Sequence, residues 1–374
     1  MIYLDSAATT LQKPPAVARA AAGAIRTMAT PGRGGHPPAM AAAAAAFACR
    51  EEAARLFSVA DPAQVVFTSS ATHGLNIAIR TLAAPGSTVL ISGYEHNAVT
   101  RPLHAIPDVT VKIARGQLFD QAAVLEDFDR LLTPEVSLAV TTHVSNVFGF
   151  ILPVEGIARL CRERGVPLIV DASQSAGCLP VSMEELGAAF IAMPGHKGLY
   201  GPQGTGLLLC GSTLPQPLLA GGTGSESKRQ EMPGYLPDRL EAGTHNMPGI
   251  AGLLEGLRFV RAKGLDRIER HEAALIRRLA SGLSGLTGAE VFAGREPGVQ
   301  AGVLSLRQNG WDCEELGEAL ARRGVAVRAG LHCAPLAHQS AGTLESGTVR
   351  LSVSAFTTAG DVSRFLQEMR RLIR

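Results

Sequence analysis

Residues 167–174 read PLIVDASQ, and residues 188–197 read AAFIAMPGHK. Each stretch is an apolar run that ends in polar residues, among them Asp171 and Lys197. Similar apolar runs recur along the chain, at residues 64–68, 88–92, 109–113, 136–142 and 204–210. Amphipathic segments separate them, and this alternation is typical of a mostly parallel sheet covered by helices on both faces. The sequence therefore predicts an α/β fold with seven strands in its large sheet.

The segments outside these runs predict the helices and a second unit. Residues 154–164 have helical apolar spacing, and the alanine-rich run 39–54 is expected to be a packed helix. The Gly- and Pro-rich segment 214–247 shows no period, and long loops of this kind are often functional. The chain then predicts two long helices and a smaller mixed unit, with helices at 248–263, 265–283, 313–323 and 360–372 and strands near 291, 302–306, 325–328 and 349–353. We expect a large domain at 13–260 and a small α+β domain formed by 1–12 and 261–374.

The amino-acid composition excludes several kinds of binding partner. The 374 residues include 35 Lys and Arg against 33 Asp and Glu, a net charge of +2, which argues against a nucleic-acid surface or a basic membrane patch. No apolar run approaches the ~20 residues of a membrane-spanning helix, and Asp5 interrupts the N-terminal region, so we expect a cytoplasmic protein. Six scattered cysteines without a C-x-x-C pair form neither a disulfide framework nor a zinc site, and no metal is expected. A small molecule is the expected partner.

Polar residues follow the predicted strands where ligands of open α/β sheets bind. Ser69 to His73 open a helix, whose free N–H groups suit a phosphate, although an ordinary helix cap would look the same. His96 and Asn146 follow two other strands, and singly each could be a loop residue. No G-x-G-x-x-G motif follows a strand, which disfavours a nicotinamide dinucleotide.

Asp171 and Lys197 suggest a different cofactor. An Asp at the end of a buried strand is costly unless it pairs with a cation. A lysine in a Gly-flanked turn can have a depressed pKa and attack an aldehyde, although by itself Lys197 could be a surface residue. Together with a phosphate cap and His96, the two residues fit a site for pyridoxal 5′-phosphate (PLP), in which an Asp tunes the ring nitrogen.

Seven short motifs in register resemble the cysteine desulfurases of the class V aminotransferase group, which are PLP enzymes of fold type I. They are DSAATT (5–10), SAT (70–72), EHN (95–97), DASQ (171–174), GHK (195–197), EAGT (241–244) and GLHCAP (330–335). The resemblance implies a homodimer in which a Thr of the Gly-rich loop reaches the other subunit's phosphate, here Thr223 or Ser225.

The resemblance also implies roles for individual residues. Lys197 is expected to bind PLP covalently, and either Lys197 or His96 is expected to move the substrate's α-proton. The other expected cofactor contacts are Asp171 at the ring nitrogen, Gln174 and Asn146 at the phenolic oxygen, His96 stacked on the ring, and Ala71, Thr72 and His196 at the phosphate. Arg350 is expected to pair with the substrate α-carboxylate, near Asn146, and Arg328 to lie close to the catalytic cysteine.

Cys333 separates a desulfurase from a transaminase, which needs no thiol. It is expected in a loop beside His332 and near Arg328, an electropositive setting that favours thiolate. The other cysteines are interpreted as packing residues, namely Cys49, Cys161, Cys178, Cys210 and Cys313.

These features predict that L-cysteine is converted to L-alanine with a persulfide on Cys333, from which an unidentified acceptor protein takes the sulfur. Alternatives on the same scaffold are selenocysteine lyase, another lyase or epimerase, or an aminotransferase. A catalytically idle PLP-binding regulatory protein is the alternative from another class.

Two positions depart from the family pattern. Pro194 stands where a hydroxyl residue often binds the phosphate, so we expect Thr205 or Ser69 to replace that hydrogen bond. An asparagine that often follows the carboxylate-binding arginine is missing from residues 354–357, which alters the expected substrate pocket.

Overall fold

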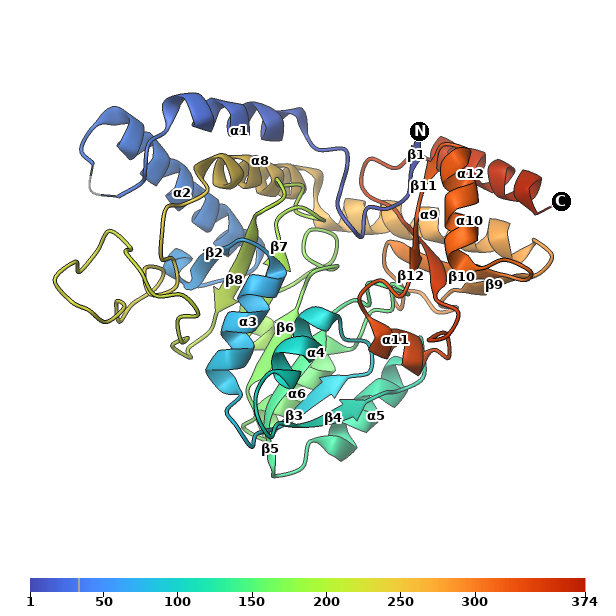
Figure 1. The fold of residues 1–374 in the computed structure, drawn as a ribbon, viewed down its shortest axis with the longest axis horizontal. Helices are drawn as coiled ribbons and strands as arrows, with labels where there is room; N and C mark the ends of the chain where they lie inside the picture. Colours follow the sequence, from blue (N-terminus) through green and yellow to red (C-terminus); the bar gives the residue numbers. More distant parts are fainter. Residues whose placement is uncertain (33, 374) are drawn as a thin grey trace.

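The computed structural model describes residues 1–32 and 34–373. Its centre is a seven-stranded sheet with strand order β2-β8-β7-β6-β5-β3-β4 (Figure 1). The strands are β2 (Val65–Thr68), β3 (Thr88–Ser92), β4 (Thr110–Ala114), β5 (Val136–Thr142), β6 (Leu168–Asp171), β7 (Phe190–Pro194) and β8 (Gly206–Cys210). Only β8 runs antiparallel to its neighbours within this sheet. The predicted α/β class and all seven strands are confirmed.

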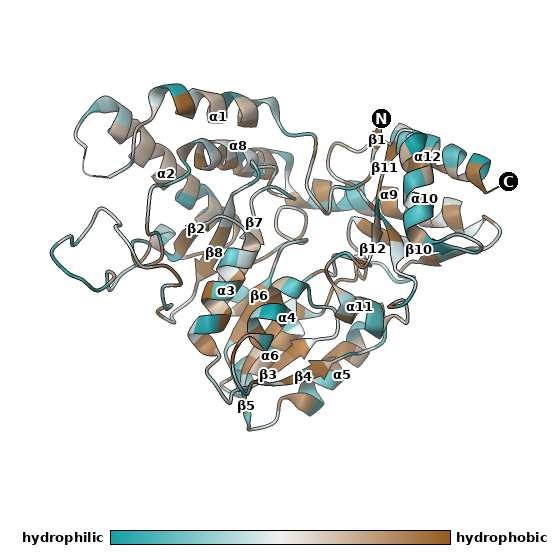
Figure 2. Ribbon diagram, in the orientation of Figure 1, coloured by the Kyte–Doolittle hydropathy of each residue, from teal (hydrophilic) through white to brown (hydrophobic). Residues whose placement is uncertain are grey.

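Helices cover both faces of this sheet because its strands are apolar on both sides. Alternate residues of β3 and β5 enter two different hydrophobic clusters, so Leu90 packs on one face while Val89 and Ile91 pack on the other. The strands of the sheet are accordingly brown in Figure 2. The helices of this part are α1 (Pro15–Thr27), α2 (Pro37–Leu56), α3 (Ala71–Leu82), α4 (Asn97–His104), α5 (Gln121–Leu131), α6 (Val154–Glu163), α7 (Met183–Leu186) and α8 (Met247–Lys263), with the 3-10 turn η1 (Pro62–Gln64).

The C-terminal part forms a smaller antiparallel sheet of order β12-β13-β10-β9, with helices packed on it. Its elements are α9 (Leu265–Ser284), β9 (Ala289–Phe292), β10 (Val303–Gln308), α10 (Cys313–Arg322), β11 (Val325–Ala326), β12 (Arg328–Gly330), α11 (Pro335–Ser340), β13 (Thr348–Ser352) and α12 (Ala359–Leu372). The strand predicted at 325–328 is in fact two strands, because β11 pairs with β1 (Ile2–Tyr3) while β12 pairs with β13. The domain limits themselves stay a prediction.

Residues 5–10, which we call the N-terminal strap, connect the two parts. At one end Asp5 forms a β-bridge with Ser352, and the Ala7 N–H donates to the Ser352 hydroxyl over 2.8 Å. At the other end the Thr10 N–H donates to the carbonyl of His196 over 3.1 Å. The strap therefore joins the small sheet to the turn that carries Lys197.

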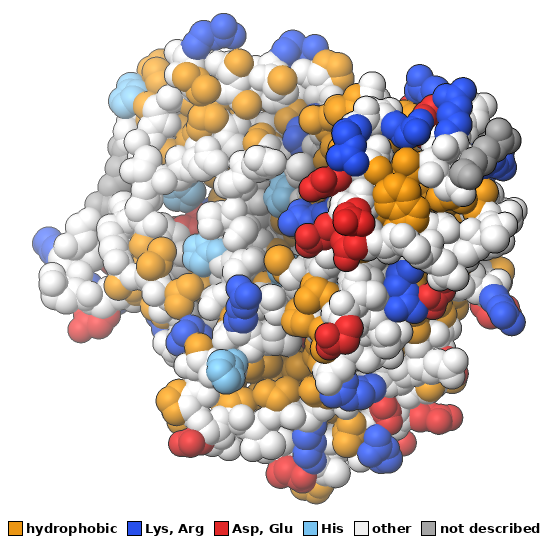
Figure 3. Space-filling model, turned by 45° about the vertical axis from the view of Figure 1, so that its right-hand side comes forward, with side chains coloured by type: hydrophobic (Ala, Val, Ile, Leu, Met, Phe, Trp, Pro, Cys, Tyr) orange, Lys and Arg blue, Asp and Glu red, His pale blue; other side chains and the backbone are white. Residues whose placement is uncertain are grey.

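Residues 211–246 form a long loop without helix or strand, which extends from the left side of the molecule in Figure 1. On the face shown in Figure 3, basic and acidic side chains are interspersed, in keeping with the small net charge. In the described part of the chain, no helix has both the length and the apolar character needed to cross a membrane.

Candidate active site

A cavity lies at the carboxyl ends of the central strands and brings together most of the predicted site residues. Those residues are Ala71, Thr72, His96, Asn146, Asp171, Gln174, His196 and Lys197. They come from strand ends and helix starts far apart in the sequence, and they meet because parallel strands end at the same edge of a sheet.

Lys197 follows β7 in a tight turn that only glycine allows. A Cβ atom on Gly195 would lie 2.2 Å from the Thr205 Oγ1, and one on Gly198 would lie 2.4 Å from the Ala176 carbonyl oxygen. Burial lowers the pKa of Lys197 to about 8, and Asp171 opposes this shift only in part. Among residues 1–32 and 34–373, no hydrogen bond holds Lys197 Nζ. Its amine is therefore available and partly neutral near neutral pH.

Asp171 is buried where β6 ends. Its Oδ1 accepts hydrogen bonds from the backbone N–H of Ser173, over 2.9 Å, and from the Ser173 hydroxyl. These bonds fix the carboxylate at the wall of the cavity. Its Oδ2 has no hydrogen bond from the described residues and is suited to a protonated ring nitrogen.

His96 caps the start of α4, and its Nδ1 accepts the Ala98 N–H over 2.9 Å. This bond places the proton of the neutral ring on Nε2. Burial is the main cause that lowers the His96 pKa, so the ring is neutral at physiological pH. Behind it, the buried Glu95 accepts from the Ser92 hydroxyl and from the Thr142 N–H, which ties the ends of β3 and β5 together.

The start of α3 forms the expected phosphate end of the cavity. Ser70 caps the helix by accepting the His73 N–H over 3.2 Å, and the N–H groups of Ala71 and Thr72 belong to the first helical turn, where donors lack helical partners. Burial lowers the pKa of His196 to about 4, so this residue is a neutral neighbour rather than a cation.

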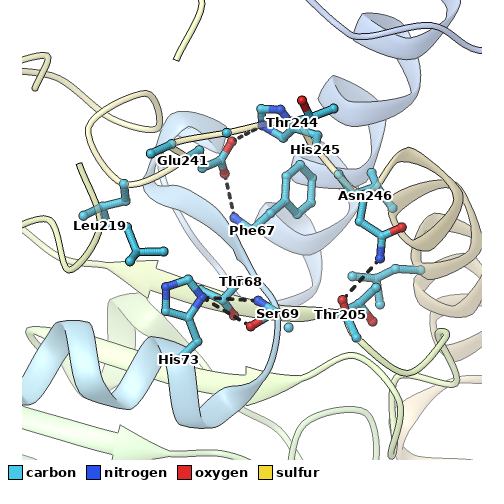
Figure 4. A pocket seen from close by; sticks show the side chains of 17 residues that line it. Phe67, Thr68, Ser69, His73, Thr205, Leu219, Glu241, Thr244, His245 and Asn246 are labelled. Carbon is cyan, nitrogen blue, oxygen red and sulfur yellow. Dashed lines mark hydrogen bonds and ion pairs between the residues drawn. The ribbon is translucent and has the colours of Figure 1, made fainter. Parts of the chain in front are cut away.

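Thr205 and Ser69, which were expected to replace the hydroxyl missing at Pro194, do not line the Lys197 cavity. Both line a neighbouring pocket (Figure 4), where Thr205 Oγ1 donates to the Pro202 carbonyl over 2.6 Å. Ser69 instead contacts the His73 ring, because the two residues lie one helical turn apart. The hydroxyl residues that line the Lys197 cavity are Ser70, Thr72, Thr142 and Ser173.

Glu241 and His245, which also line the pocket in Figure 4, belong to a buried polar network. Glu241 accepts from Arg50 over 2.5 Å, from the Phe67 N–H over 2.7 Å and from His245 over 2.6 Å. Burial would raise the pKa of Glu241, but the His245 and Arg50 contacts hold it below its ordinary value. The network fixes the end of the long loop against β2.

Arg350 and Arg328 are cross-strand neighbours on β13 and β12. Arg350 is buried, and its two terminal nitrogens donate to the Asn146 carbonyl and to Asp5 Oδ1, each over 2.9 Å. Arg328 is exposed. The Arg350 side chain is therefore next to the Asn146 wall of the cavity, as its predicted role requires.

Cys333 is exposed, whereas the other five cysteines are buried. Its carbonyl accepts the Asn97 N–H over 2.8 Å, and Asn146 Nδ2 donates to the His332 carbonyl over 2.8 Å. The loop of the small sheet is thereby docked beside His96 and the cavity. Burial raises the pKa of the thiols of Cys49, Cys161 and Cys210 to about 12 and also raises those of Cys178 and Cys313.

His332 does not supply the positive charge that its position beside Cys333 suggests. Its side chain is buried, and Nε2 contacts the Thr348 carbonyl over 3.2 Å. Burial, reinforced by Arg350, lowers its pKa to about 2, so the ring is neutral. The prediction failed because adjacent residues in a loop can point in opposite directions. Arg328, on β12 just before this loop, is the remaining cation predicted near Cys333.

Thr223 and Ser225 lie in the long loop, where their hydroxyl oxygens are 2.9 Å apart. They line a pocket formed by residues 220–233 of the loop itself, away from the Lys197 cavity of the same chain. A contact with a second subunit's phosphate stays a prediction for both residues.

Three residues near the cavity were not predicted. Asp5 pairs with Arg350, as described above. Lys13 donates to Thr10 Oγ1 over 2.9 Å and to the His196 carbonyl over 3.3 Å, and so supports the lysine turn. Glu272 on α9 is buried in an adjoining cavity that Lys197 also lines, and burial raises its pKa to about 8. Its position on the apolar face of a helix is the one signal that could have revealed it.

The family model described as aminotransferase class-V matches residues 2–365. The chain belongs to the class-V aminotransferase family. A probable cysteine desulfurase of Xylella fastidiosa is 34% identical over 98% of this chain and 89% of its own length. Another, of Mycolicibacterium paratuberculosis, is 32% identical over the whole chain, which spans 55% of that relative.

A solved structure shares the whole fold. The apo structure of a cysteine desulfurase from Thermococcus onnurineus NA1 has a TM-score of 0.93 and 30% identity, and covers 100% of this chain and 94% of that one. The α/β fold predicted from the strand pattern and the family resemblance is thereby confirmed.

Proposed function

We propose that the protein is a PLP-dependent cysteine desulfurase that converts L-cysteine to L-alanine and retains the sulfur as a persulfide on Cys333. The observation that carries this proposal is the position of Cys333. It is the one exposed cysteine of the described chain, on a loop docked by hydrogen bonds to Asn97 and Asn146 at the edge of the Lys197 cavity. The cysteine desulfurases similar to this chain support the same activity.

The residues present fit PLP. Lys197 has an amine without a hydrogen bond in the described structure, Asp171 presents a fixed carboxylate, and the first turn of α3 offers N–H donors for a phosphate. When bound, PLP supplies an electron sink for the charge that develops at the substrate's α-carbon. Gln174 Nε2 donates to the Ala7 carbonyl over 3.1 Å, so contact with the phenolic oxygen requires it to share or exchange this bond.

The protein's own groups account for the remaining steps. Arg350 binds the substrate carboxylate, and the Lys197 amine, with its lowered pKa, accepts the α-proton and returns a proton to carbon. The Cys333 thiolate attacks the substrate sulfur, so that a sulfur–sulfur bond forms as the carbon–sulfur bond breaks. The carbon fragment takes up a proton and leaves as alanine. An acceptor protein in the cytoplasm would then remove the sulfur from Cys333.

A homodimer is part of the proposal. Large apolar side chains are exposed on and before the N-terminal helices and on the long loop, namely Leu11, Ile25, Met40, Phe47, Leu218 and Leu219. Exposed apolar surface of this kind favours association with a second copy. Light scattering of the purified protein is expected to give twice the chain mass, and a monomer would contradict the dimer.

The test is turnover of L-cysteine by the purified protein loaded with PLP. We expect equimolar alanine and sulfide when a reducing thiol is present, and a persulfide on Cys333 by mass spectrometry when it is absent. Cys333→Ser should abolish both products, whereas Cys313→Ala serves as the matched control and should retain them. Borohydride should fix a pyridoxyl group on Lys197. Alanine formation by Cys333→Ser at the wild-type rate, or no adduct on Lys197, would refute the proposal.

A further inference from the structure

The guanidinium that would receive a substrate carboxylate is already paired inside the protein. Arg350 Nη2 donates to Asp5 Oδ1 and Nη1 donates to the Asn146 carbonyl, both over 2.9 Å. Arg350 Nε is buried and has no hydrogen-bond partner among residues 1–32 and 34–373. The only carboxylate on this arginine in the described structure thus comes from the N-terminal strap.

We propose that Asp5 is the resident counter-ion of the substrate-carboxylate site, which the α-carboxylate of the incoming amino acid replaces. Asp5 thereby sets how tightly the enzyme holds amino-acid substrates and how well it rejects other anions. This inference rests on the proposed function, because it takes Arg350 as the carboxylate-binding residue.

The burial of the pair explains why a counter-ion is needed. The Arg350 side chain is 3% exposed, and a buried charge without a partner is strongly destabilising. Arg328 lies directly across the strand pair and adds like-charge repulsion. Before substrate binds, Asp5 offsets both effects.

The exposure of Asp5 explains why it can be replaced. Its side chain is 20% exposed, far more than that of Arg350, and only one of its carboxylate oxygens bonds the guanidinium. A single hydrogen-bonded oxygen is a weaker partner than a carboxylate that engages two N–H groups side by side. A substrate that makes such a two-point contact can therefore displace Asp5.

Competition of this kind acts as a filter. Because an anion must displace Asp5, Arg350 contributes to its binding free energy only by the amount that exceeds the energy of the Asp5–Arg350 pair. An anion without further contacts in the cavity therefore binds weakly. An amino acid also binds at the cofactor site near Lys197, and this second contact allows it to displace Asp5. Asp5 is thus a specificity-determining residue that acts through Arg350.

The test is Asp5→Asn, which keeps the acceptor oxygen and removes the charge. We expect KM for L-cysteine to fall roughly five- to tenfold, because one nearby negative charge no longer opposes the substrate carboxylate. Sodium sulfate should inhibit the variant at least fivefold more strongly than the wild type. L-Alanine should raise the thermal unfolding midpoint of the variant more than that of the wild type, which reports binding without turnover.

Tyr3→Phe is the matched control, since it removes a hydroxyl that donates to the Asp5 and Thr9 carbonyls but leaves the ion pair intact. It should keep the wild-type KM. If Asp5→Asn is poorly folded, Asp5→Ser gives a second neutral site with the same expectation. An unchanged or increased KM in a folded variant, with cysteine still turned over, would overturn the role of Asp5 alone. Absence of cysteine turnover in the wild type would overturn the proposed function instead.

Discussion

Glu272→Gln is expected to change how the stability of the protein depends on pH. Glu272 lies on α9 with its carboxyl group in the cavity behind Lys197, and burial raises its pKa from 4.5 to about 8. The folded protein therefore keeps this proton between pH 4.5 and 8, whereas the unfolded chain releases it. Because the unfolded state binds fewer protons in this window, the contribution of Glu272 to stability falls as the pH rises.

The size of the effect follows from the two pKa values. One pKa unit corresponds to about 1.4 kcal/mol, so the difference between 4.5 and about 8 amounts to on the order of 5 kcal/mol once the group is charged in both states. Glutamine cannot ionise and has nearly the same shape. The variant should therefore equal the wild type in unfolding free energy near pH 4.5 and exceed it by several kcal/mol at pH 9.

Urea unfolding of the cofactor-free protein, followed by circular dichroism from pH 5 to 9, measures this difference. The urea midpoint of the wild type should drop across the window relative to that of Glu272→Gln. Glu269→Gln, on the same helix but only half-buried, is the control for the substitution itself. Parallel curves for wild type and Glu272→Gln would show that the carboxyl group is solvated or paired in solution, and the reasoning would fail.

Three further outcomes can be measured. Iodoacetamide should add one group to the native protein, at Cys333, because the other thiols are buried with raised pKa values. Gly195→Ala should lower the unfolding free energy by about 1–3 kcal/mol and weaken PLP binding, since its Cβ would clash with the neighbouring threonine. Arg50→Ala should cost about 3–5 kcal/mol in chemical unfolding, because it leaves a buried carboxylate without its cation.

Each of these outcomes has a comparison that isolates its cause. Urea treatment before alkylation should raise the number of adducts to six, and several adducts on the native protein would contradict the burial of the other thiols. Gly285→Ala, where no atom lies within 4 Å of the new Cβ, should be neutral. Arg322→Ala, in an exposed ion pair with Glu318, should cost less than about 1 kcal/mol. Equal losses of unfolding free energy for the two glycine variants, or for the two arginine variants, would be inconsistent with the contacts described.

The shared location of the strand-end residues could be predicted from the sequence, because the carboxyl ends of parallel strands lie at one edge of the sheet. Asp171 and Lys197 each follow an apolar run, and the structure brings them to the same cavity. Contacts that depend on side-chain direction could not be predicted in this way. His332 adjoins Cys333 in the chain, yet its ring is buried among residues of the small sheet. The pairing of Arg350 with Asp5 could not be predicted either, because no local sequence pattern relates the two residues.

The N-terminal strap also has a consequence for how the protein is made. Asp5 and Arg350 are 345 residues apart, and Thr10 and His196 are 186 apart. At synthesis rates of about 5–20 residues per second, the strap emerges roughly 20–70 s before its last partner exists. Contacts this distant in sequence also form slowly, because a long loop must close first. The strap, which is synthesised long before its partners, is therefore among the last segments to dock, and the large sheet can assemble while the substrate site is still incomplete.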